Sequence, residues 1–229
     1  MVSTGYNATC GGLWWKHDHL ANNAIENSLF LLLAGCLANR SPQNAAYYRT
    51  WALKQWAWFE ASGLINDASL VNDGLNLTTC RNNNGTTWSY NQGIVIRALV
   101  ELNRAAPNPY YIRRAHSIAR ATIARLSDVN GILHDPTETT GSADVPTFKG
   151  VLMRSLLPLA QLSGDEGYKD FILRNSESIW LRNRDGTSNK LGPVWSGPYM
   201  GNATSAVTQG AALDAIGAAA AVQRGSGYG

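Results

Sequence analysis

The stretch that decides the fold is CRNNNGTTWSYNQG, from Cys80 to Gly93, a polar segment rich in Asn and Thr. Apolar residues at helical spacing follow it at once: Ile94, Val95, Ala98, Leu99 and Leu102. This pattern predicts a loop of hydrogen-bonding side chains that leads directly into a buried helix. Ser89 is the residue expected to cap the N-terminus of that helix.

The same loop offers two aromatic faces, Trp88 and Tyr90, beside two planar amides, Asn91 and Gln92. Aromatic faces next to amides suit a ligand with many hydroxyls and apolar C–H faces, which describes a sugar. The alternative is that the aromatic residues fill the core and the amides form turns. Both interpretations stay open when this stretch is taken alone.

Composition limits the classes of function. The 229 residues are enough for one large domain or two small ones, and 19 Lys and Arg against 16 Asp and Glu give a net charge of +3. The basic residues are scattered, which argues against nucleic acid as a partner. No stretch is long and apolar enough to span a membrane, and the first fifteen residues lack the regions of a signal peptide. Five Asn-x-Ser/Thr triplets stand at Asn7, Asn39, Asn76, Asn84 and Asn202. In a secreted protein each is a surface glycan acceptor, although Pro42 makes the second a poor one, and such triplets also arise by chance in an Asn-rich chain.

The three cysteines do not form a metal-binding pattern. Cys36 lies on an apolar helical stripe and is expected to be an inert core thiol, whereas Cys10 and Cys80 lie in loops and are able to pair in an oxidising compartment. His17 and His19 are close together but are expected to be solvated rather than ligands. We therefore expect no metal and no other cofactor.

Helical periodicity recurs along the whole chain and predicts an all-α protein. The expected helices cover about 22–39, 41–63, 89–106, 108–126, 149–162, 165–179 and 203–222, and residues 224–229 are expected to be a disordered tail. Pro158 predicts a kink or an early stop in the fifth helix. Short turns within pairs and long loops between pairs indicate repeated helical hairpins, as in a solenoid or a closed toroid.

Long loops at equivalent points of each hairpin are expected to gather on one rim. Aromatic residues concentrate in these loops: Trp14, Trp15, Trp88, Tyr90, Phe148, Trp195 and Tyr199. This concentration favours a ligand site over simple filling of the core.

Several motifs resemble glycoside hydrolase family 76, the endo-α-1,6-mannanases and the related fungal cell-wall transglycosidases. They are GGLWW, NNAIENSLFLLLAG, WAWFEASGLINDASLVND, TTWSYNQGIVIRALVEL, the pair ARLSD and GILHDP, FKGVLMRSL and VWSGP, in the family's order over nearly all of 9–198. The resemblance implies an alpha/alpha toroid, retaining chemistry without a metal, and α-1,6-linked mannan or mannooligosaccharides as partner. It also implies an extracellular or cell-wall location.

One departure from the family is large. The family's catalytic signature is a pair of adjacent aspartates before the GGxWW motif, and this chain has no two adjacent Asp. The resemblance therefore implies a single domain over 1–229 that is the C-terminal portion of the family domain, an incomplete six-hairpin barrel with exposed helix faces open to association. Ser28 also stands where the family usually has an acidic residue or Gly.

Two functions follow from this comparison. The first is a truncated glycoside hydrolase acting on α-1,6-linked mannan without its catalytic pair, and the second is a non-catalytic mannan-binding protein. Hydrolysis and transglycosylation use the same acids, so that choice stays open. A helical terpene cyclase is set aside because its chemistry needs an acid cluster that this sequence lacks.

No residue is assigned as catalytic. Among the acids of the predicted loops, Asp135 and Glu138 are the best of a weak set, and the others are expected to be turn formers or solvated charges: Asp18, Asp67, Asp73, Asp128, Asp144 and Asp185. The resemblance implies sugar contacts from Trp14, Trp15, Asn23, Trp88, Tyr90, Asn91, Gln92, Phe148, Lys149 and Trp195. Each of these has an alternative role in packing.

Overall fold

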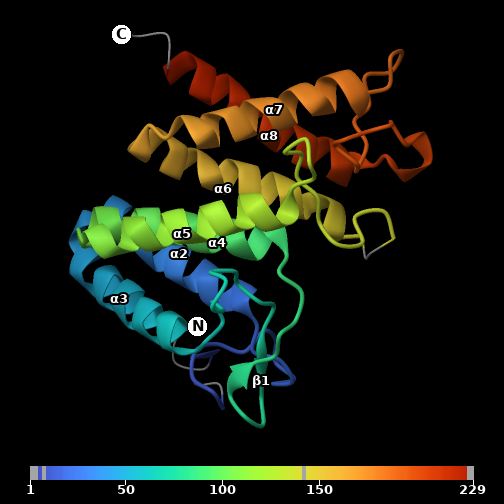
Figure 1. The fold of residues 1–229 in the computed structure, drawn as a ribbon. Helices are drawn as coiled ribbons and strands as arrows, with labels where there is room; N and C mark the ends of the chain where they lie inside the picture. Colours follow the sequence, from blue (N-terminus) through green and yellow to red (C-terminus); the bar gives the residue numbers. More distant parts are fainter. Residues whose placement is uncertain (1–4, 7–8, 141–142, 226–229) are drawn as a thin grey trace. The chain divides into compact units, whose positions relative to one another are not determined.

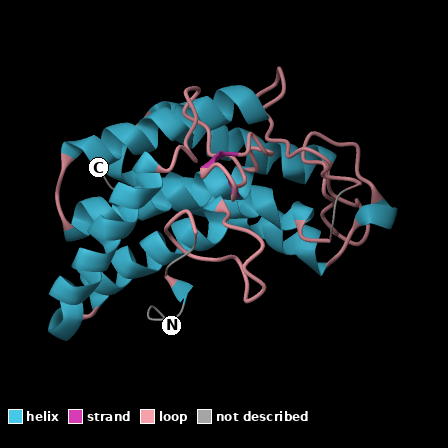
Figure 2. Ribbon diagram, turned by 90° about the horizontal axis from the view of Figure 1, so that it is seen from below, coloured by secondary structure: helices cyan, strands magenta, loops and turns pink. Residues whose placement is uncertain are grey.

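The computed structural model describes residues 5–6, 9–140 and 143–225, and its internal contacts divide the chain into two compact units, 1–121 and 122–229. Regular structure in the described residues is almost entirely helical (Figure 2), which confirms the all-α prediction. The single domain predicted over 1–229 stays a prediction, and each unit is described by itself.

The first unit is built on three long helices and most of a fourth, all of them labelled in Figure 1. They are α2 (Ala24–Arg40), α3 (Ala45–Ala61), α4 (Ser89–Ala105) and α5 (Pro109–Leu126), with the 3-10 turn η1 (Pro42–Asn44) and the antiparallel strands β1 (Leu75–Asn76) and β2 (Arg81–Asn82). The helix α2 packs against both α3 and α4, so the predicted first hairpin is confirmed.

The core of the first unit lies between α2 and α4. Leu31 and Ala34 of α2 are buried, as are the α4 residues Val95, Ala98, Leu99 and Leu102. The carboxylate of Glu101 is buried in the same interface and forms ion pairs at 3.0 Å with Arg40 and Arg104. A buried carboxylate with two cationic partners fixes the register of the two helices.

The second unit contains the end of α5, the 3-10 turns η2 (Val145–Thr147) and η3 (Gly201–Ala203), and three long helices. These are α6 (Phe148–Ser163), α7 (Glu166–Arg182) and α8 (Ala206–Gly225). The helix α8 packs against α6 and α7 through buried small residues, among them Ala211, Ala212 and Ala215. Among the described residues, no helix has both the length and the apolar character needed to cross a bilayer.

Helix ends differ from the predictions in three places. The residue that precedes α4 is Trp88, with an extended ψ of 145°, so the expected cap by Ser89 is wrong by one position. The helix α6 continues through Pro158 to Ser163, so of the two expected effects, a kink or an early stop, the early stop is wrong. The helix α8 begins at Ala206 and reaches Gly225, and the remainder of the predicted tail, 226–229, lies outside the described residues.

Candidate functional site

Two loops of the first unit, 9–23 and 62–88, are tied together. A disulfide joins Cys10 to Cys80 with a Cα separation of 5.2 Å, a pairing that the sequence left open, and Cys36 is a free, half-buried thiol. The Trp58 indole donates a hydrogen bond of 3.0 Å to the Cys10 carbonyl. Gly12 has a φ of +70°, and a Cβ at that position would collide with Trp58 and with the amide of Asn27.

The buried amide of Asn27 holds the first of these loops against the helices. Its Oδ1 accepts from the Leu13 N–H at 2.9 Å and from Gln55 Nε2 of α3 at 3.1 Å. Its Nδ2 donates to Asn22 Oδ1 at 3.0 Å. One side chain of α2 therefore anchors the GGLWW segment, the entry to α2 and the neighbouring helix.

The second loop is paired with the start of α2. The Ala24 N–H donates to the Asp73 carbonyl at 2.8 Å, and the Leu75 N–H donates to the Asn22 carbonyl at 2.9 Å. Gly74 is needed at this close approach, because a Cβ there would lie 2.8 Å from Asn23 Oδ1. The pairing places Asp73 at the N-terminus of α2.

Gln92 fixes the other side of the Asp73 segment. Its Oε1 accepts from the Val71 N–H at 2.7 Å, while its Nε2 donates to the carbonyls of Val71 at 2.7 Å and Trp88 at 3.0 Å. The side chain is fully buried, and both amide hydrogens are engaged by backbone. Gln92 thus connects the first turn of α4 to the loop that carries Asp73.

The Asp73 carboxylate contacts two residues of the polar segment from Cys80 to Gly93. Its Oδ1 accepts from the Tyr90 hydroxyl and from Asn91 Nδ2, each at 3.4 Å. Burial raises the pKa of Asp73, and the hydrogen bonds from Asn91 and Tyr90 offset only part of this effect. Burial, with the nearby Asp73 charge, also raises the pKa of Tyr90. Within the described residues, the buried Oδ1 of Asn91 has no hydrogen-bond partner.

A second carboxyl, Glu26, belongs to the same cluster. One of its oxygens accepts from the Asn23 N–H in a capping box at the start of α2. The other oxygen is buried and has no hydrogen-bond partner in the described part of the chain. Burial raises the pKa of Glu26 to about 8, and the charge of Asp73 adds to the effect. Glu26 therefore holds its proton at neutral pH.

Together Asn23, Glu26, Asp73, Tyr90 and Asn91 form what we call the Asp73 cluster. It combines a charged acceptor, a neutral acid, a phenol and amides at the start of α2 and α4. Such a mixture of donors and acceptors is suited to ligand hydroxyls. The structure thus brings three of the predicted site residues together, and Gln92 lies beside them.

Three predicted aromatic contacts also lie in the first unit. Trp14 is half-buried, and its ring stacks on His19 with centroids 5.0 Å apart. Trp15 is 51% exposed, with the Lys16 ammonium 4.9 Å from the centre of its ring. Trp88 is half-buried at the entry to α4. Trp15 thus offers the most accessible indole of the three.

The remaining predicted residues lie in the second unit. Lys149 is buried, and its ammonium donates to Glu138 Oε2 at 2.5 Å and to the Pro193 carbonyl at 2.6 Å. It also lies 4.8 Å from the centre of the buried Trp195 ring. Phe148 precedes Lys149 at the start of α6 and is half-buried. Lys149 and Trp195 are therefore in contact, as parts of one buried network.

Glu138 is shared between Lys149 and His134 in this network. Its second oxygen lies 2.7 Å from Nδ1 of His134. Burial acts to raise the pKa of Glu138, but the hydrogen bond from His134 and the charge of Lys149 outweigh it and hold the pKa below its usual range. The Glu138 hydrogen bond raises the pKa of His134 against the effect of burial. Burial lowers the pKa of Lys149, although Glu138 and Asp135 oppose this.

Sequence reasoning gave Asp73 no special role and did not consider Glu26. Asp73 was grouped with turn-forming acids because its partners lie 17 and 18 positions away, in α4. A signal for Glu26 was present, since Asn23-x-x-Glu26 matches the capping-box pattern. That signal predicts a helix start but carries no information about burial beside a second carboxyl.

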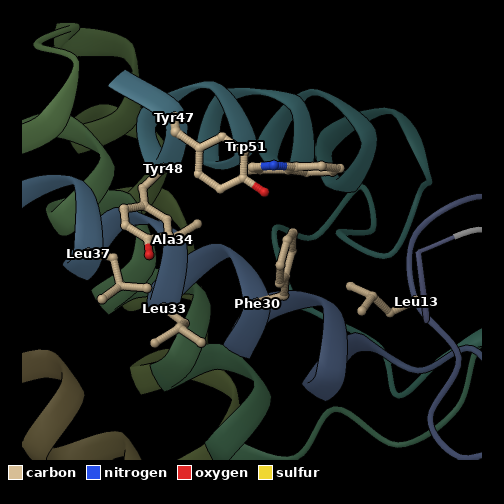
Figure 3. Close-up of a pocket in the computed structure, with 8 residues that line it drawn as sticks. All are labelled: Leu13, Phe30, Leu33, Ala34, Leu37, Tyr47, Tyr48 and Trp51. Atoms are coloured by element: carbon tan, nitrogen blue, oxygen red, sulfur yellow. The ribbon is translucent and has the colours of Figure 1, made fainter. Parts of the chain in front are cut away.

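An apolar hollow of about 200 Å³ opens between α2 and α3 (Figure 3). Phe30 lies between its two walls, and Leu33 and Tyr47 on the walls are 53% and 56% exposed. The full lining is Leu13, Phe30, Leu33, Ala34, Leu37, Tyr47, Tyr48 and Trp51. The hollow lacks the polar groups found in the Asp73 cluster, so the two features have different chemistry.

The family model and the curated relatives that this chain matches all belong to one kind of glycoside hydrolase. Residues 1–226 match the model of glycosyl hydrolase family 76. The mannan endo-1,6-alpha-mannosidase DCW1 of Candida glabrata is 27% identical over 170 residues, which are 67% of this chain and 36% of that protein. The namesake from Candida albicans is 32% identical over 97 residues, which are 38% of this chain and 21% of that protein. The chain thus matches about a third or less of these curated relatives.

Solved structures show the same fold. The Lin0763 protein of Listeria innocua superposes with a TM-score of 0.87 at 25% identity, covering 98% of this chain and 63% of that one. The GH76A alpha-1,6-mannanase of Salegentibacter sp. HEL1_6 gives 0.84 at 24% identity, covering 96% and 66%. An inactive variant of that mannanase, with two adjacent aspartates changed to asparagine, was solved with alpha-1,6-mannotriose (TM-score 0.84, 23% identity, 96% and 66% covered).

These likenesses confirm the predicted fold class, helical hairpins of the alpha/alpha toroid type, and the resemblance recognised in the motifs. The family model extends over nearly the whole sequence, so the match does not depend on one motif. The chain belongs to glycosyl hydrolase family 76.

Proposed function

We propose that this chain binds α-1,6-linked mannan as part of an endo-acting glycoside hydrolase. The observation that carries the proposal is the Asp73 cluster, where Asp73, Tyr90 and Asn91 present acceptors and donors beside two helix starts. The long 3.4 Å contacts of Asp73 and the unpartnered Oδ1 of Asn91 in the described structure leave bonding capacity for sugar hydroxyls.

The roles of the predicted residues follow from their surroundings. We assign hydroxyl binding to Asn23, Tyr90 and Asn91, with Asp73 added as the charged acceptor. Trp15 has the open indole face that a pyranose ring requires. Further contacts are proposed for Trp14, Trp88, Phe148, Lys149 and Trp195, and Gln92 acts by positioning the loop of Asp73.

Catalysis in retaining glycosidases needs two carboxyl groups about 5 Å apart, one as nucleophile and one as acid/base. The inactive Salegentibacter variant lacks two adjacent aspartates, and this sequence contains no adjacent pair. We therefore propose that the catalytic pair belongs to a part of the family domain outside these 229 residues. The alternative, a mannan-binding protein without catalysis, rests on the same cluster.

Binding is tested first, by calorimetric titration of the purified chain with α-1,6-mannotriose. Asp73→Asn should weaken binding about 10- to 100-fold, because a hydrogen bond to a charged acceptor is worth about 1.5–3 kcal/mol. Asp67→Asn is the matched control, since Asp67 lies exposed in the same loop. Equal affinity of both variants and the parent would refute the assignment of Asp73.

Activity is tested separately, by mass spectrometry of a linear α-1,6-mannooligosaccharide after long incubation. Binding without product supports a catalytic pair outside the chain or the non-catalytic alternative. Shorter or longer oligomers, lost in Asp73→Asn, Asp135→Asn or Glu138→Gln, would show that a carboxyl of this chain is catalytic. That outcome would overturn the proposal about the missing pair.

The apolar hollow between α2 and α3 is consistent with an incomplete family domain. About a third of each of two solved relatives lies outside the match, since only 63% and 66% of their chains is covered. We propose that further helices of a family 76 domain cover Leu33 and Tyr47 and so close the hollow. For location we propose the cell exterior or the cell wall, supported by the Cys10–Cys80 disulfide and the fungal relatives.

A further inference from the structure

The five Asn-x-Ser/Thr triplets differ in the contacts that their Asn side-chain amides make. Asn39, Asn76, Asn84 and Asn202 are all exposed, but the amide nitrogen of Asn39 is engaged by another helix, and Asn7 lies outside the described residues. N-glycosylation modifies the amide nitrogen of Asn, so the surroundings of Nδ2 decide whether a folded protein tolerates the modification.

Two of the exposed triplets flank the disulfide. Asn76 stands four positions before Cys80 and Asn84 four positions after it. The Oδ1 of Asn76 accepts from the N–H groups of Thr78 and Thr79, each at 3.0 Å, which forms an Asx turn. In the described structure the Nδ2 atoms of Asn76 and Asn84 donate to no protein group. A disulfide forms in the oxidising compartments where N-glycans are added.

Asn202 lies in a similar position in the second unit. It is an exposed residue of the short turn η3, before the start of α8. No hydrogen bond from its amide to the described protein is present. A glycan on this nitrogen would extend into solvent without displacing a contact.

Asn39 is the opposite case. Its Nδ2 donates to the carbonyl of Glu101 and to Glu101 Oε2, both at 2.9 Å. Both amide hydrogens are thus used at the interface of α2 and α4, and Pro42 follows the triplet. A glycan at this nitrogen would replace contacts to a buried carboxylate.

We propose that Asn76, Asn84 and Asn202 are N-glycosylation sites and that Asn39 is not. The co-reactant is an oligosaccharide linked to a lipid through a pyrophosphate. The Asn amide nitrogen attacks the anomeric carbon, a C–N bond forms, the C–O bond to the pyrophosphate breaks, and the amide nitrogen loses a proton. This assignment depends on the contacts of each Asn amide nitrogen and on the compartment, and it is independent of mannan binding.

The test is secretion of the full chain from a eukaryotic host and release of its glycans by peptide-N-glycosidase in ¹⁸O water. Peptide mass spectrometry then identifies each modified Asn by its conversion to labelled Asp. We expect label at positions 76, 84 and 202 and none at position 39. Label at Asn39, or absence of label at any of the other three, would overturn the assignment for that site.

A matched pair of variants separates glycosylation from effects on folding. Thr78→Ala removes the triplet at Asn76, whereas Thr79→Ala leaves it intact, and both keep the N–H groups that donate to Asn76 Oδ1. Thr78→Ala should lose the mass of one glycan and Thr79→Ala should lose none. Equal glycan mass in the two variants would refute the site at Asn76.

Discussion

Replacing Glu26 with Gln should make the stability of the protein less sensitive to a rise in pH between 4.5 and about 8. The neutral amide keeps an oxygen that accepts from the Asn23 N–H, so the capping box survives. In the parent protein, ionising the buried carboxyl of Glu26 costs free energy, and this cost raises its pKa to about 8. The substitution removes the ionisable group and with it this cost. Because the folded pKa exceeds the ordinary value of 4.5, the folded state binds the proton more tightly than the unfolded state.

The sign and size of the effect follow from linkage. Stability from this group is fully present below the unfolded pKa and is lost as pH rises through the folded pKa, a window from 4.5 to about 8. Within it the free energy of unfolding falls by about 1.4 kcal/mol per pH unit, or about 5 kcal/mol in total. Glu26→Gln should therefore have a pH profile of stability that is flatter by about 1.4 kcal/mol per unit.

Urea unfolding of both proteins at about pH 5, 6, 7 and 8 measures the difference. The rise in the pKa of His134 makes stability fall in the same direction, but it is common to both proteins and cancels. Glu166→Gln is the control, because Glu166 is an exposed carboxylate, 75% accessible, in a surface ion pair. Parallel curves for the parent and Glu26→Gln would refute the assignment of a neutral Glu26.

Three further predictions concern stability and association. Cys80→Ser opens a loop that spans 70 positions from Cys10, and thermal or urea unfolding should show a loss of about 4 kcal/mol by loop-closure entropy; an unchanged midpoint would contradict this. Lys149→Met leaves Glu138 without its buried cation and should cost about 3–5 kcal/mol, whereas Lys149→Met with Glu138→Leu should recover much of it in the same assay. Leu33→Glu places a charge in the apolar hollow and should reduce both self-association and the binding of a hydrophobic dye. An unchanged sedimentation profile would count against the hollow as a surface for association.

The helices were predictable from the sequence because their apolar residues repeat at a fixed period. The start of α5 at Pro109 and the entry to α7 after Asp165 match the predictions closely, since Pro at the first turn and Asp at the cap are local signals. The start of α4 at Ser89 matches the prediction, but the cap is misplaced by one residue because Trp88 takes the cap position without a capping side chain of its own. Pro158 did not end α6, because packing of that helix outweighs one lost backbone hydrogen bond.

The site was predictable only in part. Tyr90 and Asn91 stand out in the sequence because they lie in one unusual stretch, and the structure places them together with Asp73. The proximity of Asp73 to Glu26 arises from a loop that returns to the start of α2 almost fifty residues later. Local sequence patterns do not contain such long-range contacts, so neither the burial of Glu26 nor its raised pKa was foreseeable.

The backbone bonds of Gln92 have a consequence for the energetics of ligand capture. A loop that must become ordered on binding loses conformational entropy, which weakens affinity. Here the amide of Gln92 already holds Val71 and Trp88 on either side of the Asp73 cluster in the free protein. The cluster is therefore preorganised, and if it binds the proposed mannan ligand, the binding free energy is not spent on ordering this loop.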